Sequence, residues 1–299
     1  MSGAGTAGLE PHHRHRGHRV VFTGADGKRL VASRYEADAV AAPAPAALLL
    51  HGGGQTRHAW SATAARLAAA GFTAIALDLR GHGDSDWVAD GAYAFSAFAR
   101  DVTAVADAIA AETGRRPAVI GASLGGLSGI LALGARANLL AGLILVDITP
   151  KMNMDGVAGI NRFMMAKAYE GFGSIEEAAD AVAAYLPHRP RPKNLDGLRK
   201  NLRQREDGRF YWHWDPRFFE GPQPVNAGRE TQYQDFAQAA RSIRTPLMLV
   251  RGRSSELVGE DEVEDFRRLC PQAEYADIAG ARHMVAGDKN DVFAHTILE

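Results

Sequence analysis

The chain has little cysteine, little net charge and no long apolar run. Its 299 residues contain one cysteine, Cys270, which excludes an internal disulfide and any metal site built on paired cysteines. Lys and Arg number 34 against 35 for Asp and Glu, so the net charge of -1 provides no general field to attract nucleic acid or an anionic membrane. We therefore expect a small-molecule partner, and neither nucleic acid nor a membrane.

The amino-terminal segment lacks the apolar stretch of a secretory signal, and no later segment has the length of a membrane span. A cytoplasmic protein is the expectation, in agreement with the single cysteine. Residues 1–17 are small or basic and predict a disordered tail. A metal site on the histidines there is conceivable, but a solvated cationic arm explains the same composition: His12, His13, His15 and His18. We expect no metal and no cofactor, and the sequence indicates no particular oligomeric state.

Strand and helix patterns alternate along most of the chain. Residues 18–23 and 28–35 alternate apolar and polar around a glycine-rich turn at 24–27, which predicts an antiparallel hairpin. Short apolar runs predict further strands at 48–50, 72–78, 117–121, 142–147, 246–251 and 273–278. Helices are expected near 58–70, 95–112, 124–136 and 260–269, and from about 289. This alternation predicts an α/β protein with a doubly wound, mostly parallel sheet and helices on both faces.

The alternation stops between 150 and 240. A helical pattern at 174–185 is followed by breaks at Pro187, Pro190 and Pro192. We interpret 150–240 as an inserted helical cap on a core made of 18–149 and 241–299.

A serine sits where one predicted strand turns into a helix. Gly121-Ala122-Ser123-Leu124-Gly125 fits G-x-S-x-G, a short motif that gains its meaning from the strand before it and the helix after it. Such a turn imposes an unfavourable backbone conformation on the serine and exposes its hydroxyl. A phosphate-binding turn is the structural alternative, but G-x-G-x-x-G is absent at the first strand-to-helix turn. Ser123 is therefore predicted to be a nucleophile.

A serine hydroxyl needs a base and an acid that orients the base. His283 follows the last predicted strand and is the expected base. The acid should lie between the serine and the histidine in the chain, after a strand. Glu256 follows strand 246–251 and is our expectation, and Asp147 at the end of strand 142–147 is the alternative.

The glycine run after strand 48–50 is the expected source of an oxyanion hole. An oxyanion formed on the substrate should meet two backbone N–H groups. Leu124 follows the nucleophile and supplies one, and Gly53 is best placed for the second, with Gly54 next. In the loop 78–86 we expect three carboxylates to organise turns and an ion pair with Arg80: Asp78, Asp84 and Asp86. His51 and His82 sit in glycine turns, where packing or backbone hydrogen bonds account for them.

Six motifs together resemble those of a known superfamily. They are HGGG at 51–54, DLRGHGDS at 78–85, GASLGG at 121–126, VDITP at 146–150, VRGRSSELV at 250–258 and GARHMVAGD at 280–288. The set resembles the α/β-hydrolase superfamily, and most of all its epoxide-hydrolase-like and haloalkane-dehalogenase-like branch with the related bacterial esterases and lactonases. Epoxide hydrolases and haloalkane dehalogenases of that branch use an aspartate nucleophile, whereas this chain has Ser123, which implies acyl transfer.

The sequence thus predicts a serine hydrolase that cleaves a carboxylic ester or lactone through an acyl-enzyme. The segment 210–214 is unusually aromatic, and Trp212 and Trp214 are candidates to bind an apolar or aromatic substrate, with packing of the cap as the alternative. Carbon-carbon bond hydrolysis and cofactor-free perhydrolysis of the haloperoxidase type are available to the same residues. The alternative that is not an enzyme is a ligand receptor that has the same fold but does not turn over its ligand.

Overall fold

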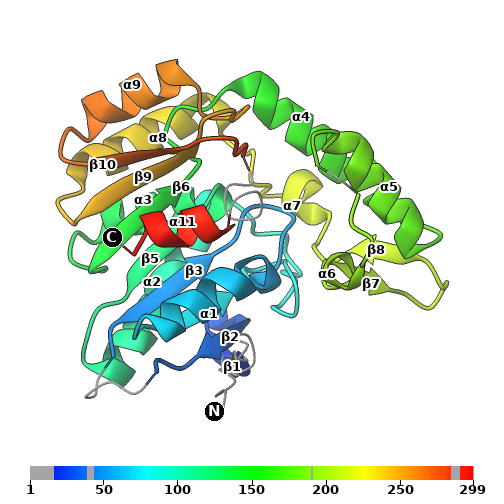
Figure 1. Cartoon of the computed structure of the whole chain (residues 1–299), viewed down its shortest axis with the longest axis horizontal. Helices are drawn as coiled ribbons and strands as arrows, with labels where there is room; N and C mark the ends of the chain where they lie inside the picture. Colours follow the sequence, from blue (N-terminus) through cyan, green and yellow to red (C-terminus); the bar gives the residue numbers. More distant parts are fainter. Residues whose placement is uncertain (1–16, 39–43, 190, 284–289, 299) are drawn as a thin grey trace, which may run out of the picture.

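The computed structural model describes residues 17–38, 44–189, 191–283 and 290–298. Residues 1–16 of the predicted tail at 1–17 lie outside these residues, as does 284–289, which includes part of the motif around His283. The described residues form one large sheet with helices on both sides and a smaller segment that stands over one edge (Figure 1).

The central sheet has eight strands in the order β1-β2-β4-β3-β5-β6-β9-β10. Their bounds are β1 His18–Thr23, β2 Arg29–Tyr35, β3 Ala46–Leu50, β4 Thr73–Leu77, β5 Ala118–Ala122, β6 Gly142–Val146, β9 Leu247–Gly252 and β10 Glu274–Ile278. The strands β1 and β2 pair antiparallel, β2 also pairs antiparallel with β4, and the pairs from β4 to β10 are parallel. The predicted mostly parallel sheet is confirmed, and every residue of β3 and β4 is buried, as expected of strands covered on both faces.

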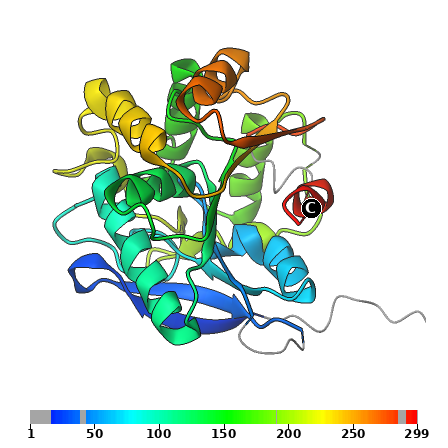
Figure 2. The same cartoon turned by 90° about the vertical axis from the view of Figure 1, so that its left-hand side faces the viewer.

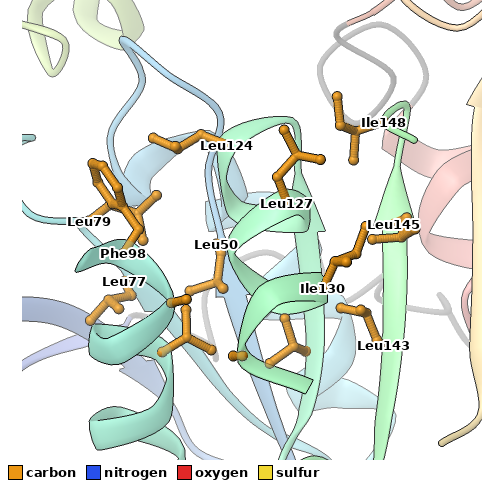
Figure 3. Close-up of a cluster of buried hydrophobic side chains, with 14 of the residues drawn as sticks. Leu50, Leu77, Leu79, Phe98, Leu124, Leu127, Ile130, Leu143, Leu145 and Ile148 are labelled. Atoms are coloured by element: carbon orange, nitrogen blue, oxygen red, sulfur yellow. The ribbon is translucent and has the colours of Figure 1, made fainter. Parts of the chain in front are cut away.

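Helices cover the two faces of the sheet unequally (Figure 2). One face carries α1 Ser61–Ala69 and α11 Asn290–Thr296, which contact each other. The other carries α2 Phe95–Thr113, α3 Leu124–Ala135, α8 Arg229–Ser242 and α9 Glu260–Leu269, packed side by side in that order. Each face has its own apolar core. Leucines and isoleucines of α3 meet those of β3 and β6 in the larger core (Figure 3), and Trp60, Leu67 and Phe293 lie in the smaller one.

The segment after β6 leaves the sheet and stands over the carboxyl ends of its strands (Figure 1). It contains α4 Met154–Met165, α5 Ile175–Tyr185, α6 Asp196–Arg199, β7 Leu202–Gln204, β8 Phe210–Trp212 and α7 Arg217–Glu220. We refer to residues 151–228 as the cap. The two short strands pair as an antiparallel hairpin, so the aromatic run at 210–212 is a strand of the cap.

The helix α8 belongs to the core, although the expected cap boundary at 240 would assign most of it to the cap. Phe236 of α8 packs its ring against that of Phe95, with centroids 5.0 Å apart. A Cβ built on Gly134 of α3 would lie 2.5 Å from Ala239 Cβ, so the two helices touch closely. Helix α8 thus packs with the helices of the core.

Candidate functional site

Ser123 lies in a strained turn between β5 and α3. Its backbone has φ 45° and ψ -114°, a conformation that is costly for a residue with a Cβ and that typically marks functional sites. The turn lifts the side chain above the carboxyl edge of the sheet, as the strand-turn-helix pattern predicts.

Two glycines allow the strand and the helix to approach closely enough for this turn. A Cβ on Gly121 would lie 2.6 Å from the carbonyl carbon of Gly125, and a Cβ on Gly125 would lie 2.5 Å from Leu50 Cβ. Real Cβ atoms do not approach other atoms to such distances. The glycine positions of G-x-S-x-G are thus required by packing.

His283 pairs with Asp147. Its Nδ1 lies 2.9 Å from Asp147 Oδ2, and the carboxylate is fully buried, with 0% exposure. Asp147 follows β6 and has φ 50°, a second strained position at the same sheet edge. The expectation that Glu256 would be the partner of the histidine is therefore corrected in favour of the alternative, because the loop after β9 presents a different side chain to this carboxylate.

That side chain is Ser255, which the sequence analysis did not single out. Ser255 Oγ lies 2.5 Å from Asp147 Oδ2 and also accepts the N–H groups of Leu257 and Val258, at 3.0 and 3.1 Å. The second carboxylate oxygen, Oδ1, accepts the N–H of Gly252 at 2.9 Å. The Ser255 hydroxyl oxygen accepts two backbone N–H groups with its two lone pairs. Its proton is therefore donated to Asp147. The one signal in the sequence was the position of Ser255 directly before the expected acid, Glu256. Its contact with Asp147 arises because β6 and β9 are neighbours in the sheet.

Glu256 lies on the wall of a cavity. Its Oε2 is buried and has no hydrogen-bond partner within the described part of the chain. Burial raises the pKa of the Tyr185 phenol to about 12, and the negative charge of Glu256 acts in the same direction. Tyr185 stacks on Phe163 with ring centroids 4.1 Å apart. Glu256 therefore faces the aromatic wall of the cap.

The glycine loop after β3 lies beside Ser123. A Cβ on Gly52 would be 3.4 Å from Ser123 Cβ. Gly52 donates its N–H to Gln55 Oε1 at 3.0 Å, and Gly54 donates to His82 Nε2 at 3.1 Å. Gly54, the second choice for the oxyanion hole, is thus already engaged as a donor.

Two backbone N–H groups beside Ser123 remain available. Among the described residues, no acceptor meets the N–H of Gly53 or that of Leu124. Leu124 is the first residue of α3, where helix geometry leaves N–H groups without intrahelical partners. The two expected oxyanion donors are therefore both unengaged.

Two buried histidines flank this loop. His51 Nδ1 bonds Gly52 O at 2.8 Å and its Nε2 accepts the N–H of Leu79 at 3.0 Å. Burial lowers the pKa of His51 to about 4, and burial together with the neighbouring His51 lowers the pKa of His82 to about 3. Both side chains have 0% exposure and are neutral at pH 7.

A cavity of about 790 Å³ separates the core from the cap and contains this site. Its core wall includes Gly52, Gly53, Gly54, Ser123, Leu124 and His283, and its cap wall includes Met164, Phe163, Tyr185, Trp212, Trp214, Phe218 and Phe219. Ser123 and His283 share this cavity without a hydrogen bond between their side chains in the described structure. Such bonds commonly tighten only when substrate is bound.

The loop 78–86 is organised by carboxylates, but Arg80 has a different partner from those expected. Its guanidinium binds Asp101 of α2, with Nε 2.6 Å from Oδ2, and both side chains are fully buried. Asp78 instead pairs with Arg57, which also contacts Asp84 at 2.8 Å. Asp86 pairs with Arg29 at 3.2 Å. These ion pairs join the loop to the first helical turn after β3 and to β2.

No group of three or more His, Cys, Asp or Glu side chains within 17–38, 44–189, 191–283 and 290–298 could hold a metal ion. The histidines of the predicted tail before residue 17 lie outside these ranges. No helix in the part of the chain that the structure describes is long and apolar enough to cross a membrane.

Comparison with known proteins supports the architecture. Residues 45–289 match a family model described as alpha/beta hydrolase fold. The esterase Rv0045c of Mycobacterium tuberculosis is 29% identical over 257 residues, which are 82% of this chain and 80% of that protein. A 2-(acetamidomethylene)succinate hydrolase of Mesorhizobium japonicum is 27% identical over 228 residues, or 72% of this chain and 73% of the relative. A crystal structure of E-2-(acetamidomethylene)succinate hydrolase superposes with a TM-score of 0.78 at 22% identity, over 94% of this chain and 98% of that one, which shows the shared fold.

Proposed function

The chain belongs to the α/β-hydrolase fold family, and we propose that it is a serine hydrolase that cleaves a carboxylic ester, lactones included, through an acyl-enzyme. The observation that carries this proposal is the hydrogen bond between His283 and the buried Asp147, made at the cavity that also contains the strained Ser123. Relatives that are an esterase and another hydrolase agree with hydrolysis.

The roles follow from the hydrogen bonds. A buried carboxylate held by Gly252 and Ser255 accepts the Nδ1 proton of His283, which leaves Nε2 as the unprotonated nitrogen. In this tautomer Nε2 takes the proton of Ser123 while Oγ attacks the carbonyl carbon, and Asp147 stabilises the imidazolium that forms.

The carbonyl oxygen becomes an oxyanion in this step, and in the proposed mechanism the unengaged N–H groups of Gly53 and Leu124 receive it. The imidazolium of His283 then gives its proton to the departing alcohol. Water then attacks the carbonyl carbon of the acyl-enzyme while His283 takes its proton. His283 returns this proton to Ser123 Oγ as the carboxylic acid leaves.

The cavity indicates the kind of substrate. Its cap wall is built from methionine and aromatic side chains, and its volume of about 790 Å³ is ample for a substrate of drug size. Trp212 and Trp214 both line it while being 8% and 2% exposed, so they serve the cap's packing and present part of their surface to the cavity. We propose that they contact the apolar or aromatic body of the ester.

A hydrolase for a carboxylate-bearing substrate is the second candidate. Four cationic residues and one acidic residue, Glu256, line the cavity: Lys151, Arg189, Lys200 and Arg282. Lys151 also lies 3.9 Å from Glu262, and both arginines have partners of their own. Cations on the wall of a cavity would attract an anionic ligand, and the likeness to a 2-(acetamidomethylene)succinate hydrolase agrees with this candidate.

A substrate panel tests the proposal. Purified protein is assayed with neutral aryl esters, hemisuccinate esters, lactones, 2-(acetamidomethylene)succinate and 1,3-diketones, with product analysis by mass spectrometry and with an added peroxide arm. The proposal requires turnover of at least one ester or lactone to acid and alcohol. Selective turnover of the dicarboxylate favours the second candidate. Cleavage of a diketone alone transfers the function to carbon-carbon hydrolysis, peracid formation alone to perhydrolysis, and no turnover of any member favours a receptor.

A further inference from the structure

His82 is a buried side chain for which the proposed chemistry has no use, yet both of its ring nitrogens are engaged. Nδ1 lies 2.9 Å from the carbonyl oxygen of Arg80, and Nε2 lies 3.1 Å from the N of Gly54. A carbonyl only accepts, so the proton is on Nδ1, and Nε2 must then be the acceptor for the Gly54 N–H. The geometry alone fixes a neutral ring in a single tautomer.

The bond to Gly54 holds the glycine loop at residues 52–54, which we call the oxyanion loop. The N–H of Gly54 belongs to the peptide group that follows Gly53, and the N–H that Gly52 donates to Gln55 belongs to the peptide group that precedes Gly52. The peptide group between these two carries the free N–H of Gly53. Side chains therefore hold the peptide on each side of the donor, and the donor itself stays available to an oxyanion.

His82 also touches the cap. Its ring meets that of Phe218 edge to face, with centroids 5.2 Å apart. Its backbone forms an antiparallel bridge with Trp214, flanked by hydrogen bonds of 2.8 Å from Gly83 N to His213 O and from Asp215 N to Gly81 O. One residue thus links the cap's aromatic wall to the oxyanion loop.

We propose that His82 is a positioning residue that holds the Gly53 N–H in place for the oxyanion and ties this loop to the cap. This inference rests on the proposed function. The hydrogen bond from Gly54 requires an acceptor at the position of Nε2 and does not require the volume of the ring. A side chain that keeps an acceptor there should therefore keep most of the turnover.

Two substitutions of similar length separate the acceptor from the packing. In His82→Gln the amide oxygen can take the place of Nε2, whereas His82→Met fills the same space and lacks a strong acceptor. We expect His82→Met to lower kcat by about 10- to 100-fold with KM changed by less than about threefold, because a misplaced donor affects the transition state more than the bound ester. His82→Gln should stay within about fivefold of the wild-type kcat.

A trifluoromethyl ketone that resembles the best ester of the panel provides the second readout, since serine adds to it and forms an oxyanion. Its inhibition constant should rise in His82→Met by the same factor by which kcat falls, while the Kd of the corresponding unreactive amide stays constant. A purely structural role would weaken both ligands together. His82→Asn, whose shorter amide cannot reach Gly54, replaces the methionine variant if that variant does not fold.

The outcomes distinguish this inference from its premise. If Ser123→Ala retains ester turnover, the proposed function fails. If Ser123→Ala is inactive, the proposed function stands, and two results would then overturn the role of His82. In one, His82→Gln loses as much activity as His82→Met. In the other, His82→Met loses no activity.

Discussion

At the scale of single residues, the orientation of His283 depends on a carboxylate that is held from three sides. Asp147 accepts hydrogen bonds from a backbone N–H, a hydroxyl and the imidazole, so its charge is compensated although it is fully buried. In the proposed mechanism, Gly252 and Ser255 thus hold the carboxylate that stabilises the imidazolium.

The first prediction compares the two candidate acids. Asp147→Asn keeps the shape of the side chain but removes the charge and the preference for the correct tautomer, so kcat for the best ester should fall about 10^3- to 10^4-fold. Glu256 makes no hydrogen bond to His283 among the described residues, so Glu256→Gln should change kcat by less than about tenfold and serves as the matched control. A larger loss in the glutamine variant than in the asparagine variant, both shown to be folded by circular dichroism, would return the role to Glu256.

The choice of acid shows where residue-level prediction from sequence ends. Ser123 and His283 were predicted from a distinctive motif and from a place in the chain order, respectively. The acid could not be predicted in this way, since two carboxylates follow two strands, and chain position does not tell which of them faces the histidine. That depends on β6 lying next to β9, so that the loop after β9 directs Ser255 to Asp147 and Glu256 into the cavity.

At the scale of elements, strands and helices of the core were predicted closely. The expected strand at 142–147 and the helix at 124–136 correspond to β6 and α3, because largely buried strands and long apolar helices carry strong sequence patterns. The cap was less predictable. The hairpin of β7 and β8 has strands of three residues each, which is too short for a periodic pattern, and the ring of its Trp212 is held by tertiary contacts with Phe163 and Phe172.

The second prediction concerns the turn between β5 and α3. Gly125→Ala should lower the free energy of unfolding by about 1–3 kcal/mol, because the new Cβ would lie 2.6 Å from the carbonyl oxygen of Leu50. Gly159→Ala in α4 is the control: no neighbouring atom lies within 4 Å of its added Cβ, and alanine favours a helix by about 1 kcal/mol. Urea denaturation measures both. Equal effects of the two substitutions would contradict the close packing of this turn.

The third prediction concerns the aromatic wall of the cap. Trp212 contacts Phe163 and Phe172, and Trp212→Phe keeps an aromatic ring in this cluster while removing part of the cavity surface. We expect kcat/KM to fall about tenfold for bulky aryl esters and less than about threefold for the smallest ester. The same loss on every ester, together with a lower Tm, would assign the residue to packing alone.

At the scale of the whole molecule, the buried histidines make stability depend on pH. Burial keeps His51 and His82 neutral in the folded chain, with pKa values of about 4 and about 3, whereas both titrate near 6.5 when unfolded. The unfolded chain therefore binds more protons below about pH 6.5, and the stability that is present above this pH is lost as the pH falls toward the folded pKa values.

The fourth prediction follows from this linkage. Between pH 6 and pH 5, each of these histidines should remove up to about 1.4 kcal/mol of unfolding free energy per pH unit. His51→Gln should make the dependence on pH shallower by about that amount. Urea denaturation at several pH values measures the slopes. Identical slopes in the wild type and in His51→Gln would show that His51 is not held neutral in the folded chain.

Covalent capture tests whether Ser123 is the nucleophile of the proposed acyl transfer. The wild-type protein is treated with a fluorophosphonate and examined by intact mass and peptide mapping, beside Ser123→Ala, whose Tm is measured in parallel. We predict one adduct, on Ser123, in the wild type, no adduct in the alanine variant, and a loss of ester turnover on the order of 10^4-fold or more in that variant. Labelling of another residue, or near wild-type turnover by a folded Ser123→Ala, would rule out Ser123 as the nucleophile.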